Sequence, residues 1–320
     1  MALVKNPDQI SLAMLGMVDG NGHPYSWTAI INGKYDAKVM ADCGYPVIPE
    51  YLGAQPKEAL GIEGASVTHI WCDDPADAKK VAKATFIPNV VDSAEEVIGQ
   101  VDAVIIPTDK GWEHLDRAKP FIEAGLPVFI DKPMTDREDH LQQFVKWQRE
   151  GRSILSTSAM RYAREFAECR GRLSEIGQPR LITITTCKSW ERYGIHALEA
   201  VYPFLSPGGW VSVTNTGTEE ANIVHIRHES GVDVVIAAIA DMYGAFGCLN
   251  VYGTEGTLAA GDTDAFYAFK TQLVAYVDYL RTGQLPFAFD QTVELMKIII
   301  AGIRSRDESA RTVTLSEIKA

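Results

Sequence analysis

Short apolar runs alternate with helix-like segments through the first half of the chain. The candidate strands are residues 10–17, 65–72, 101–107, 127–130 and 153–158. Helix starts lie between them: Asp74 precedes Pro75 as an N-cap, and residues 93–96 and 135–138 each have the Ser/Thr-x-x-Glu form of a capping box. Because strands that alternate with helices form parallel βαβ units, this half predicts an α/β fold with a doubly wound parallel sheet.

The second half has a different pattern. Its longer candidate strands are residues 180–187, 222–228, 232–242 and 248–252, several of them joined by short polar turns, and helices at about 263–281 and 290–304 close the chain. Strands with little between them pair antiparallel. We therefore expect a doubly wound domain over residues 1–133, with a long insertion at about 31–64, and a second α/β domain with a large, mostly antiparallel open sheet over residues 134–320. Long loops tend to be functional, so residues 35–60 are expected to form a flap or contact near the first loop.

The charge balance argues against two classes of partner. Thirty Lys and Arg residues against 42 Asp and Glu residues give a net charge of −12, which repels nucleic acid and anionic membrane surfaces. The apolar stretches fall far short of the roughly 20 residues that span a bilayer. The N-terminus lacks the features of a signal peptide, so a cytoplasmic location is expected. Five scattered cysteines without a CxxC pair predict reduced thiols and no metal site.

Polar and flexible residues follow several of the candidate strands. Ligands of a doubly wound sheet bind beyond the carboxyl ends of its strands, so the loops after the first, second, fourth and fifth strands are expected to form one site. The first loop is rich in glycine without the GxGxxG fingerprint. Its candidate cofactor-binding residues are Gly16, Gly20, Asn21, Gly22 and His23. Asp73 follows the second strand, where a carboxylate either accepts hydrogen bonds from an adenosine ribose or supports the adjacent helix start. Lys132 follows the fifth strand and is held by Pro133.

Several motifs resemble those of the Gfo/Idh/MocA oxidoreductases, the family named for glucose-fructose oxidoreductase and inositol dehydrogenase. In the first half these are residues 101–108, then His114, then residues 124–133, which end in Asp-Lys-Pro where the family has Glu-Lys-Pro. In the second half, residues 194–199 (Gly-Ile-His-Ala-Leu-Glu) look like the family's Gly-x-His-x-x-Asp, and residues 253–258 are similar to its sheet-edge hairpin. The resemblance covers nearly the whole chain.

The resemblance implies an N-terminal Rossmann domain and hydride transfer between NAD(P) and a sugar, polyol or similar compound. Because the Asp73 carboxylate disfavours a 2′-phosphate, NAD is expected over NADP. It implies that Lys132 hydrogen-bonds the reacting hydroxyl and that His196 takes or returns its proton. The implied cofactor-binding set also includes Pro107, Thr108, His114 and Asp131. The family's open sheet is often used for oligomerisation, so a homodimer or homotetramer is expected.

Four basic residues lie near the predicted cleft of this acidic chain: Arg161, Arg164, Lys188 and Arg192. They either recognise a substrate carboxylate or phosphate through a guanidinium fork, or form ordinary surface ion pairs. Nearby aromatic rings, among them Tyr162, Trp190 and Tyr193, either offer a face to a sugar or pack in the core.

Two departures from the family pattern leave other functions open. Arg192 stands where an acidic residue usually precedes the histidine by four positions, and Val18 stands where the second glycine of the first loop is expected. One alternative is a lyase or glycosidase that uses bound NAD transiently or not at all. Another is a non-catalytic sugar-binding or regulatory protein, which a stabilising ligand without turnover would indicate.

Overall fold

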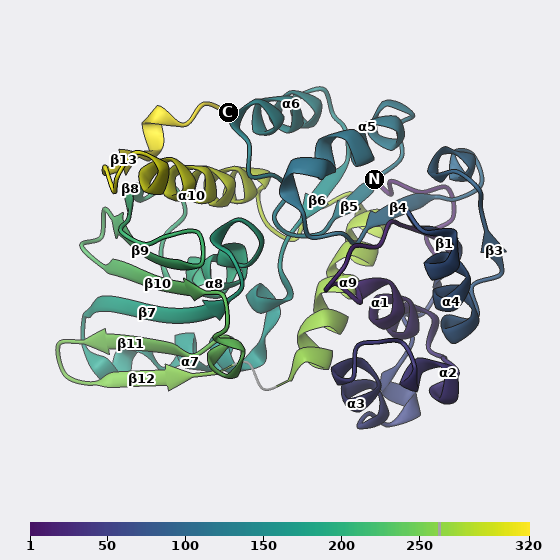
Figure 1. Cartoon of the computed structure of the whole chain (residues 1–320), viewed down its shortest axis with the longest axis horizontal. Helices are drawn as coiled ribbons and strands as arrows, with labels where there is room; N and C mark the ends of the chain where they lie inside the picture. Colours follow the sequence, from purple (N-terminus) through teal and green to yellow (C-terminus); the bar gives the residue numbers. More distant parts are fainter. Residues whose placement is uncertain (262–263) are drawn as a thin grey trace.

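The first layer is a six-stranded parallel sheet with the strand order β3-β2-β1-β4-β5-β6 (Figure 1). The computed structural model describes residues 1–261 and 264–320. The strands of this sheet are β1 (Ile10–Leu15), β2 (Ala65–Trp71), β3 (Asn89–Val90), β4 (Ala103–Ile106), β5 (Val128–Ile130) and β6 (Ile154–Ser156). The doubly wound sheet expected from the sequence is confirmed.

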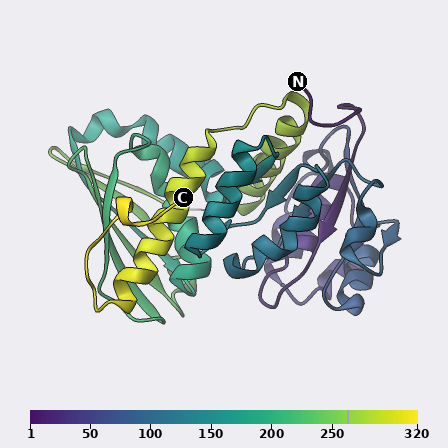
Figure 2. The same cartoon turned by 90° about the horizontal axis from the view of Figure 1, so that it is seen from above.

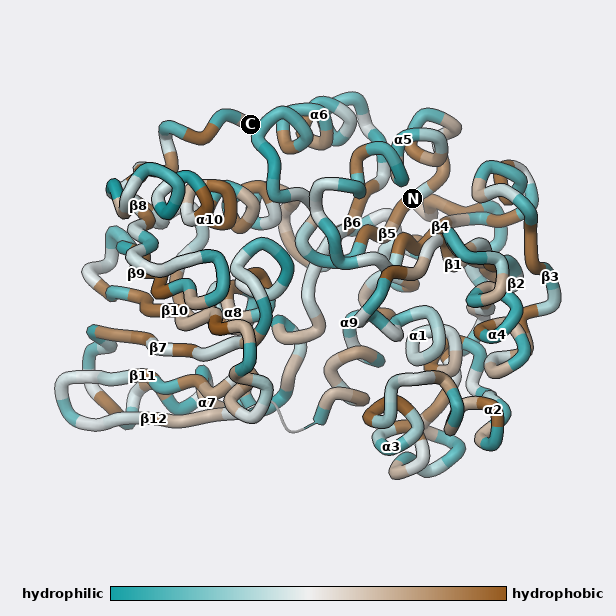
Figure 3. The backbone as a smooth tube through the Cα atoms, viewed as in Figure 1, coloured by the Kyte–Doolittle hydropathy of each residue, from teal (hydrophilic) through white to brown (hydrophobic). Residues whose placement is uncertain are grey.

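Helices cover both faces of this sheet because the strands are apolar on both sides. Alternate residues of β1 enter two separate cores: Leu12 and Met14 pack on the side of α1 (His23–Asn32) and α4 (Pro75–Thr85), whereas Ala13 and Leu15 pack on the other. That second side is covered by α5 (His114–Glu123) and α6 (Glu138–Arg149). The apolar strands β4 and β5 lie in the brown centre of Figure 3. The order reverses between β1 and β4, which is where ligands bind in such sheets.

A seven-stranded sheet forms the second layer, with the order β12-β11-β7-β10-β9-β8-β13. Its strands are β7 (Pro179–Cys187), β8 (Trp210–Asn215), β9 (Ala221–His228), β10 (Asp233–Ile239), β11 (Leu249–Gly253), β12 (Thr257–Ala260) and β13 (Val313–Thr314). All neighbours pair antiparallel except β7 and β10, which are parallel. The mostly antiparallel sheet is thus confirmed, although the sequence did not indicate β8 and β13.

One face of the second sheet is covered by helices and the other is open (Figure 2). The covering helices are α8 (Ile195–Val201) and α10 (Phe289–Asp307), while α7 (Arg164–Gly171) lies beside β12. The short helical turns of the chain are Lys57–Ala59, Ala94–Val97, Gly111–Glu113, Ala159–Tyr162, Leu173–Ile176, Trp190–Gly194 (a π-helical turn), Tyr202–Phe204, Tyr243–Ala245 and Leu315–Glu317. In β9 exposed and buried residues alternate along the strand, as expected for a half-covered sheet.

The two layers are interlocked rather than divided at residue 133. Strand β6 follows that residue and still joins the first sheet through β5. Helix α9 (Ala265–Thr282), far along the chain, packs into the first domain's core, where the Tyr276 hydroxyl donates to the carbonyls of Val104 (3.0 Å) and Pro127 (3.2 Å). The first structural unit therefore extends beyond the expected boundary, and α9 connects both halves.

The insertion after α1 contains two short helices, α2 (Ala37–Ala41) and α3 (Val47–Gly53). It lies directly against the loop after β1: a Cβ on Gly22 would be 2.6 Å from Cδ1 of Ile48 and 2.7 Å from Cδ2 of Tyr45. The Tyr51 hydroxyl donates to Oγ of Ser26 on α1 (2.5 Å). The segment is therefore packed onto the first loop.

The helix starts predicted from local sequence are confirmed at two positions and wrong at a third. Asp74 caps α4 by accepting from the Ala76 amide at 2.8 Å, and Ser93 forms its capping box, so both predictions are confirmed. The capping box predicted at residues 135–138 is wrong, because Thr135 Oγ1 instead accepts from the Arg137 amide and α6 begins at Glu138. The helix expected from Thr263 begins at Ala265, and Thr263 lies outside the described residues. No helix in the described part of the chain is long and apolar enough to cross a bilayer.

Candidate active site

The loops after β4 and β5 are joined by a buried histidine. His114 is fully buried, with Nδ1 2.8 Å from the Pro133 carbonyl and Nε2 2.9 Å from the Thr108 carbonyl. Burial lowers its pKa below the ordinary histidine value. Pro107 is bound in turn by the Asn21 side-chain amide (2.9 Å), which brings in the loop after β1. His114 thus joins the loops after β4 and β5, and Asn21 connects the loop after β1 to them.

Lys132 is buried between two carboxylates at the end of β5. Its side chain is only 3% exposed, and Nζ lies 3.7 Å from Oδ2 of Asp131 and 3.9 Å from Oδ2 of Asp109. The ring of Tyr193 lies beneath it, with its centroid 4.9 Å from Nζ. Among the described residues, Oδ1 of Asp131 and Oδ2 of Asp109 have no hydrogen-bond partner. Buried carboxylate oxygens without partners are costly, so this cluster has free capacity to accept hydrogen bonds from a ligand.

Two cations from the second domain reach across to this cluster. Arg192, on the Trp190–Gly194 turn, donates to Oδ1 of Asp109 (2.7 Å) and to the Asp19 carbonyl (3.4 Å). Lys188 donates to the Gly20 carbonyl (3.2 Å). Burial alone would raise the pKa of Asp109, but Lys132 and Arg192 outweigh it and hold that pKa below the ordinary value. Asp109 is therefore ionised at neutral pH, and both cations fix the loop after β1.

His196, the expected proton carrier, lies near the start of α8. Its Nδ1 is 2.7 Å from Oγ of Ser158, and its ring meets those of Tyr193 and Phe246 edge to face. Burial, with the positive charge of Lys132 nearby, lowers its pKa well below 6.5. His196 is therefore uncharged at pH 7.

His23, expected to bind cofactor, stands at the first position of α1. Its Nδ1 is 2.9 Å from Oδ2 of Asp131. Its ring stacks on Trp27 at 4.4 Å and meets the edge of Phe269 at 5.2 Å. The carboxylate and the two rings together hold the imidazole in one orientation.

Both histidines line a cavity of about 460 Å³ between the two domains. The lining residues are His23, Val47, Ala159, Met160, Cys187, Lys188, Tyr193, His196, Tyr243, Phe246, Ala265, Ala268 and Phe269. Hydrocarbon and aromatic groups dominate this lining, and the histidines, Lys188 and the tyrosine hydroxyls are its polar groups. Such a cavity has the size and the character of a small-molecule site.

Three residues expected to bind substrate lie outside this lining. Trp190 is fully buried and donates its indole N–H to the Ile299 carbonyl (2.9 Å), so its ring is part of the core. Arg161 pairs with Glu199 and lies over the ring of Phe287. Tyr162, next to Arg161, does not line the cavity either.

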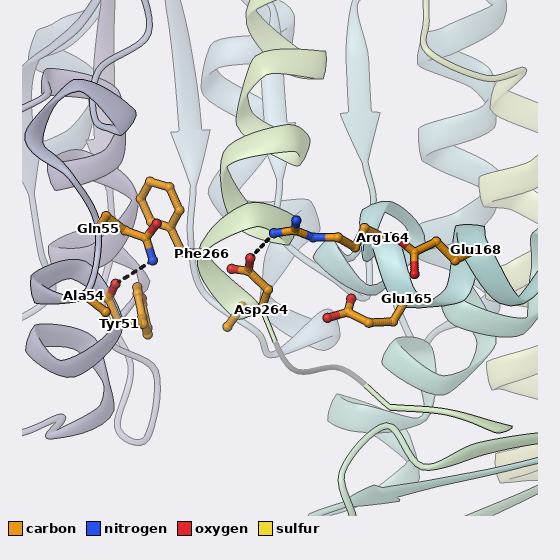
Figure 4. Close-up of a pocket in the computed structure, with 9 residues that line it drawn as sticks. Tyr51, Ala54, Gln55, Arg164, Glu165, Glu168, Asp264 and Phe266 are labelled. Carbon is orange, nitrogen blue, oxygen red and sulfur yellow. Dashed lines mark hydrogen bonds and ion pairs between the residues drawn. The ribbon is translucent and has the colours of Figure 1, made fainter.

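Arg164 lies at a neighbouring groove of about 540 Å³ between α3 and α7, where it pairs with Asp264 (Figure 4). Arg161 and Arg192 likewise have carboxylate partners, Glu199 and Asp109. A guanidinium already held by a carboxylate is not available as a fork for a substrate anion. Lys188 is the basic residue of the four that lines the cavity.

The loops after β1 and β2 fit the adenosine end of a dinucleotide, but the start of α1 differs from an ordinary phosphate-binding helix start. Gly16 has φ +104°, and a Cβ there would lie 3.0 Å from Thr108 Cγ2, so the backbone approaches as closely as the first glycine of such a loop requires. Asp73 is half-exposed beyond β2 and paired with Arg117 (2.9 Å). At the start of α1, however, the His23 amide donates to Asn21 Oδ1 (2.9 Å). Since Pro24 has no N–H, the first helical amides are not left for a phosphate.

Sequence reasoning missed Asp109 and the pairing of His23 with Asp131. Asp109 lies two residues beyond Pro107, at the end of a buried strand, and that position was a signal of a site residue. The pairing of His23 had no comparable signal, because it depends on how far α1 is displaced from the end of β1.

Comparisons with known proteins agree with this architecture. Residues 42–158 match the model of the oxidoreductase family with an NAD-binding Rossmann fold, Gfo/Idh/MocA. A putative UDP-kanosamine synthase oxidoreductase subunit from Amycolatopsis mediterranei is 26% identical over 111 residues, which are 35% of this chain and 31% of that protein. The match thus spans about a third of the curated relative.

Solved structures resemble nearly the whole chain. Scyllo-inositol dehydrogenase from Lactobacillus casei, solved with NAD(H) and scyllo-inositol, has a TM-score of 0.72 at 14% identity and covers 96% of this chain and 99% of its own. An oxidoreductase from Agrobacterium radiobacter, solved with NAD+, L-tartaric acid and magnesium, has a TM-score of 0.72 at 15% identity and covers 97% and 99%. Residues 42–158 thus resemble the NAD-binding Rossmann domain of the Gfo/Idh/MocA oxidoreductases, and the whole chain has the two-layer fold of these solved dehydrogenases.

Proposed function

We propose that this chain transfers a hydride between NAD and the CH–OH carbon of a sugar-like or polyol-like alcohol, or the reverse. The observation that carries the proposal is the buried Lys132, set between Asp109 and Asp131 at the end of β5 and close to the cavity that His196 lines. A fixed ammonium group in a site that excludes water stabilises alkoxide character on a reacting oxygen.

Gly16 and Asp73 are the residues that would hold the adenosine half of the cofactor, and residues 20–22 would lie beside its phosphates. NAD, when bound, supplies the hydride acceptor or donor. Because the start of α1 is self-capped, we assign the balancing of phosphate charge to Lys188, which already contacts the Gly20 carbonyl.

The lining of the cavity bears on the substrate. Relatives were solved with scyllo-inositol and tartaric acid, both rich in hydroxyl or carboxyl groups. Here Phe246, Phe269 and Met160 line much of the wall, and each substrate hydroxyl left unpaired against them costs about 1–3 kcal/mol. We therefore expect compounds that carry an apolar group beside the reacting carbinol to be preferred over free polyols. A carboxylate, if present, would meet Lys188.

We also propose that the open face of the second sheet forms a homo-oligomer interface. Ile223 and Tyr252 are each more than a third exposed there, and Val235 and Ala237 are half-exposed on the neighbouring strand β10. A broad face of this kind is typical of subunit contacts. Size-exclusion chromatography with light scattering tests it: a dimer or tetramer that Ile223→Lys dissociates supports the interface, and a wild-type monomer contradicts it.

The first experiment is to denature the purified protein, assay the released material for NAD and NADP, and titrate the cofactor-free protein with NADH and NADPH by fluorescence. Binding with preference for NADH, followed by NADH formation from a panel of sugars, polyols and their aryl derivatives, supports the proposal. Tightly retained NAD with substrate cleavage but no net NADH would indicate a lyase or glycosidase. Ligand stabilisation without cofactor binding or turnover would indicate a binding protein.

A further inference from the structure

We propose that His23, oriented by Asp131, is the catalytic residue that exchanges a proton with the substrate hydroxyl. This inference rests on the proposed function, because it assigns the proton that accompanies the hydride. It adds a second histidine to a cavity in which sequence reasoning placed only His196 as the proton carrier.

The geometry of His23 is that of an oriented base. Nδ1 lies 2.9 Å from Oδ2 of Asp131, and Nζ of Lys132 lies 3.7 Å from the same oxygen. With Nδ1–H donating to that carboxylate, the lone pair of the neutral ring lies on Nε2. Within residues 1–261 and 264–320, Nε2 makes no hydrogen bond, and the side chain lines the cavity.

The ring cannot easily turn to another orientation. Trp27, itself fully buried, stacks on one face at 4.4 Å, and Phe269 contacts the ring at 5.2 Å. Catalytic groups need such support, because a misplaced base loses much of its effect.

His196 is less suited to receive the proton. Its Nδ1 is engaged with a neutral hydroxyl, that of Ser158, and no carboxylate of the described residues is paired with it. Burial, together with the charges of Lys132 and Lys188, lowers its pKa well below 6.5, so its protonated form is disfavoured. We assign to His196 a neutral hydrogen bond to the substrate.

The ionisable groups that face His23 come from both domains. Asp131 is bonded to the ring from the end of β5, and the ionised Asp109 stands at the end of β4. Lys132 lies 3.7 Å from the same Asp131 oxygen, and His196 is neutral. A carboxylate bonded directly to an imidazole is the arrangement of sites in which an acid orients a histidine base.

The step balances as alcohol plus NAD+ giving ketone, NADH and a proton. The carbinol C–H bond breaks and its electron pair leaves with the hydride. The O–H bond breaks, its proton joins Nε2 of His23, and the electrons left on oxygen form the C=O bond. His23 then returns the proton to water, and the reverse sequence applies to reduction.

The first arm of the test does not depend on activity. In protein labelled with 15N-histidine, NMR at neutral pH reports which ring nitrogen of His23 carries hydrogen. We expect Nδ1 to be protonated in the wild type and that preference to be lost in Asp131→Asn. A wild-type ring protonated on Nε2 alone overturns the proposal, since no lone pair would then face the substrate.

The second arm measures turnover with the holoenzyme. We expect His23→Ala to lower kcat by about 10²–10⁴-fold with little change in the NADH dissociation constant, and free imidazole to restore part of the rate. Asp131→Asn should lower kcat less, and Asp131→Glu should recover it. The matched control is His225→Gln, since His225 pairs with Asp233 at the same 2.9 Å on the outer sheet face.

The outcomes separate the two proposals. Wild-type kcat in His23→Ala overturns the role of His23 and leaves the oxidoreductase function standing. Failure of the wild type to bind NADH or to oxidise any CH–OH compound contradicts the proposed function, while the NMR arm still decides whether the His23–Asp131 pair presents a base.

Discussion

The two walls of the interdomain cavity differ in charge. On the first-domain wall, His23 lines the cavity and pairs with Asp131, and Lys132 and Asp109 lie behind it; we call this the charged wall. On the second-domain wall, Lys188 is the charged lining residue, and His196 contacts a serine hydroxyl and two aromatic rings. We therefore expect proton chemistry at the wall whose histidine has a carboxylate partner, and expect the other wall to shape the substrate.

The largest effect is expected from removing the ammonium of the charged wall. Lys132→Met keeps the length of the side chain and should lower kcat on the order of 10²–10⁴-fold, because the alkoxide loses its stabilising charge. Circular dichroism should show an intact fold. Lys119→Met, which removes an exposed lysine paired with Glu123, should leave kcat unchanged. Wild-type turnover in Lys132→Met would remove this residue from the mechanism.

A change in stability is expected at the ion pair between Arg192 of the second domain and Asp109 of the first. Arg192→Met leaves the buried Asp109 with Lys132 as its remaining cation, and should lower the free energy of unfolding by about 1–3 kcal/mol. In Asp109→Asn the charge that Arg192 neutralises is gone. Adding Arg192→Met to this variant should therefore lower the free energy of unfolding by less than Arg192→Met does in the wild type. Urea unfolding of both single variants and the double variant measures this. Strictly additive losses would show that the pair does not interact.

The sequence was sufficient for elements whose signals are local. The apolar strands and the helix cap at Asp74 predicted the alternation of strands and helices in the first domain. The position of Lys132 just beyond β5 was also predicted, because the carboxyl ends of parallel strands meet at the same edge of a sheet. It was not sufficient for contacts that join distant segments. Arg192 was expected to face a substrate and instead binds Asp109, 83 residues away in the chain. Such pairs depend on how the two domains pack, which no local pattern encodes.

The preference for NADH over NADPH tests whether Asp73, beyond β2, lies at the adenosine ribose of the cofactor. Asp73→Ser removes the carboxylate that we propose for the ribose and frees Arg117 for a 2′-phosphate, so the preference for NADH over NADPH should fall about tenfold. Asp74→Ser is the matched control, because serine still caps α4. Fluorescence titration with both cofactors gives the ratio. An unchanged ratio in Asp73→Ser would place the ribose elsewhere.

The smallest effect is a pH-dependent change in stability, and it concerns His196 on the second-domain wall. His196 has a pKa below that of a histidine in the unfolded chain, so below about pH 6.5 the unfolded state binds more protons and the folded state loses stability as pH falls. His196→Asn keeps a hydrogen-bonding side chain near Ser158 but cannot titrate. Between pH 6.5 and 5.5 the variant should lose about 1 kcal/mol less stability than the wild type, while the buried His114 still contributes in both. Thermal unfolding across this range measures the difference, with His225→Gln as the control. If the wild type and His196→Asn lose stability in parallel, His196 accepts a proton in the folded state, and the contrast between the two walls fails.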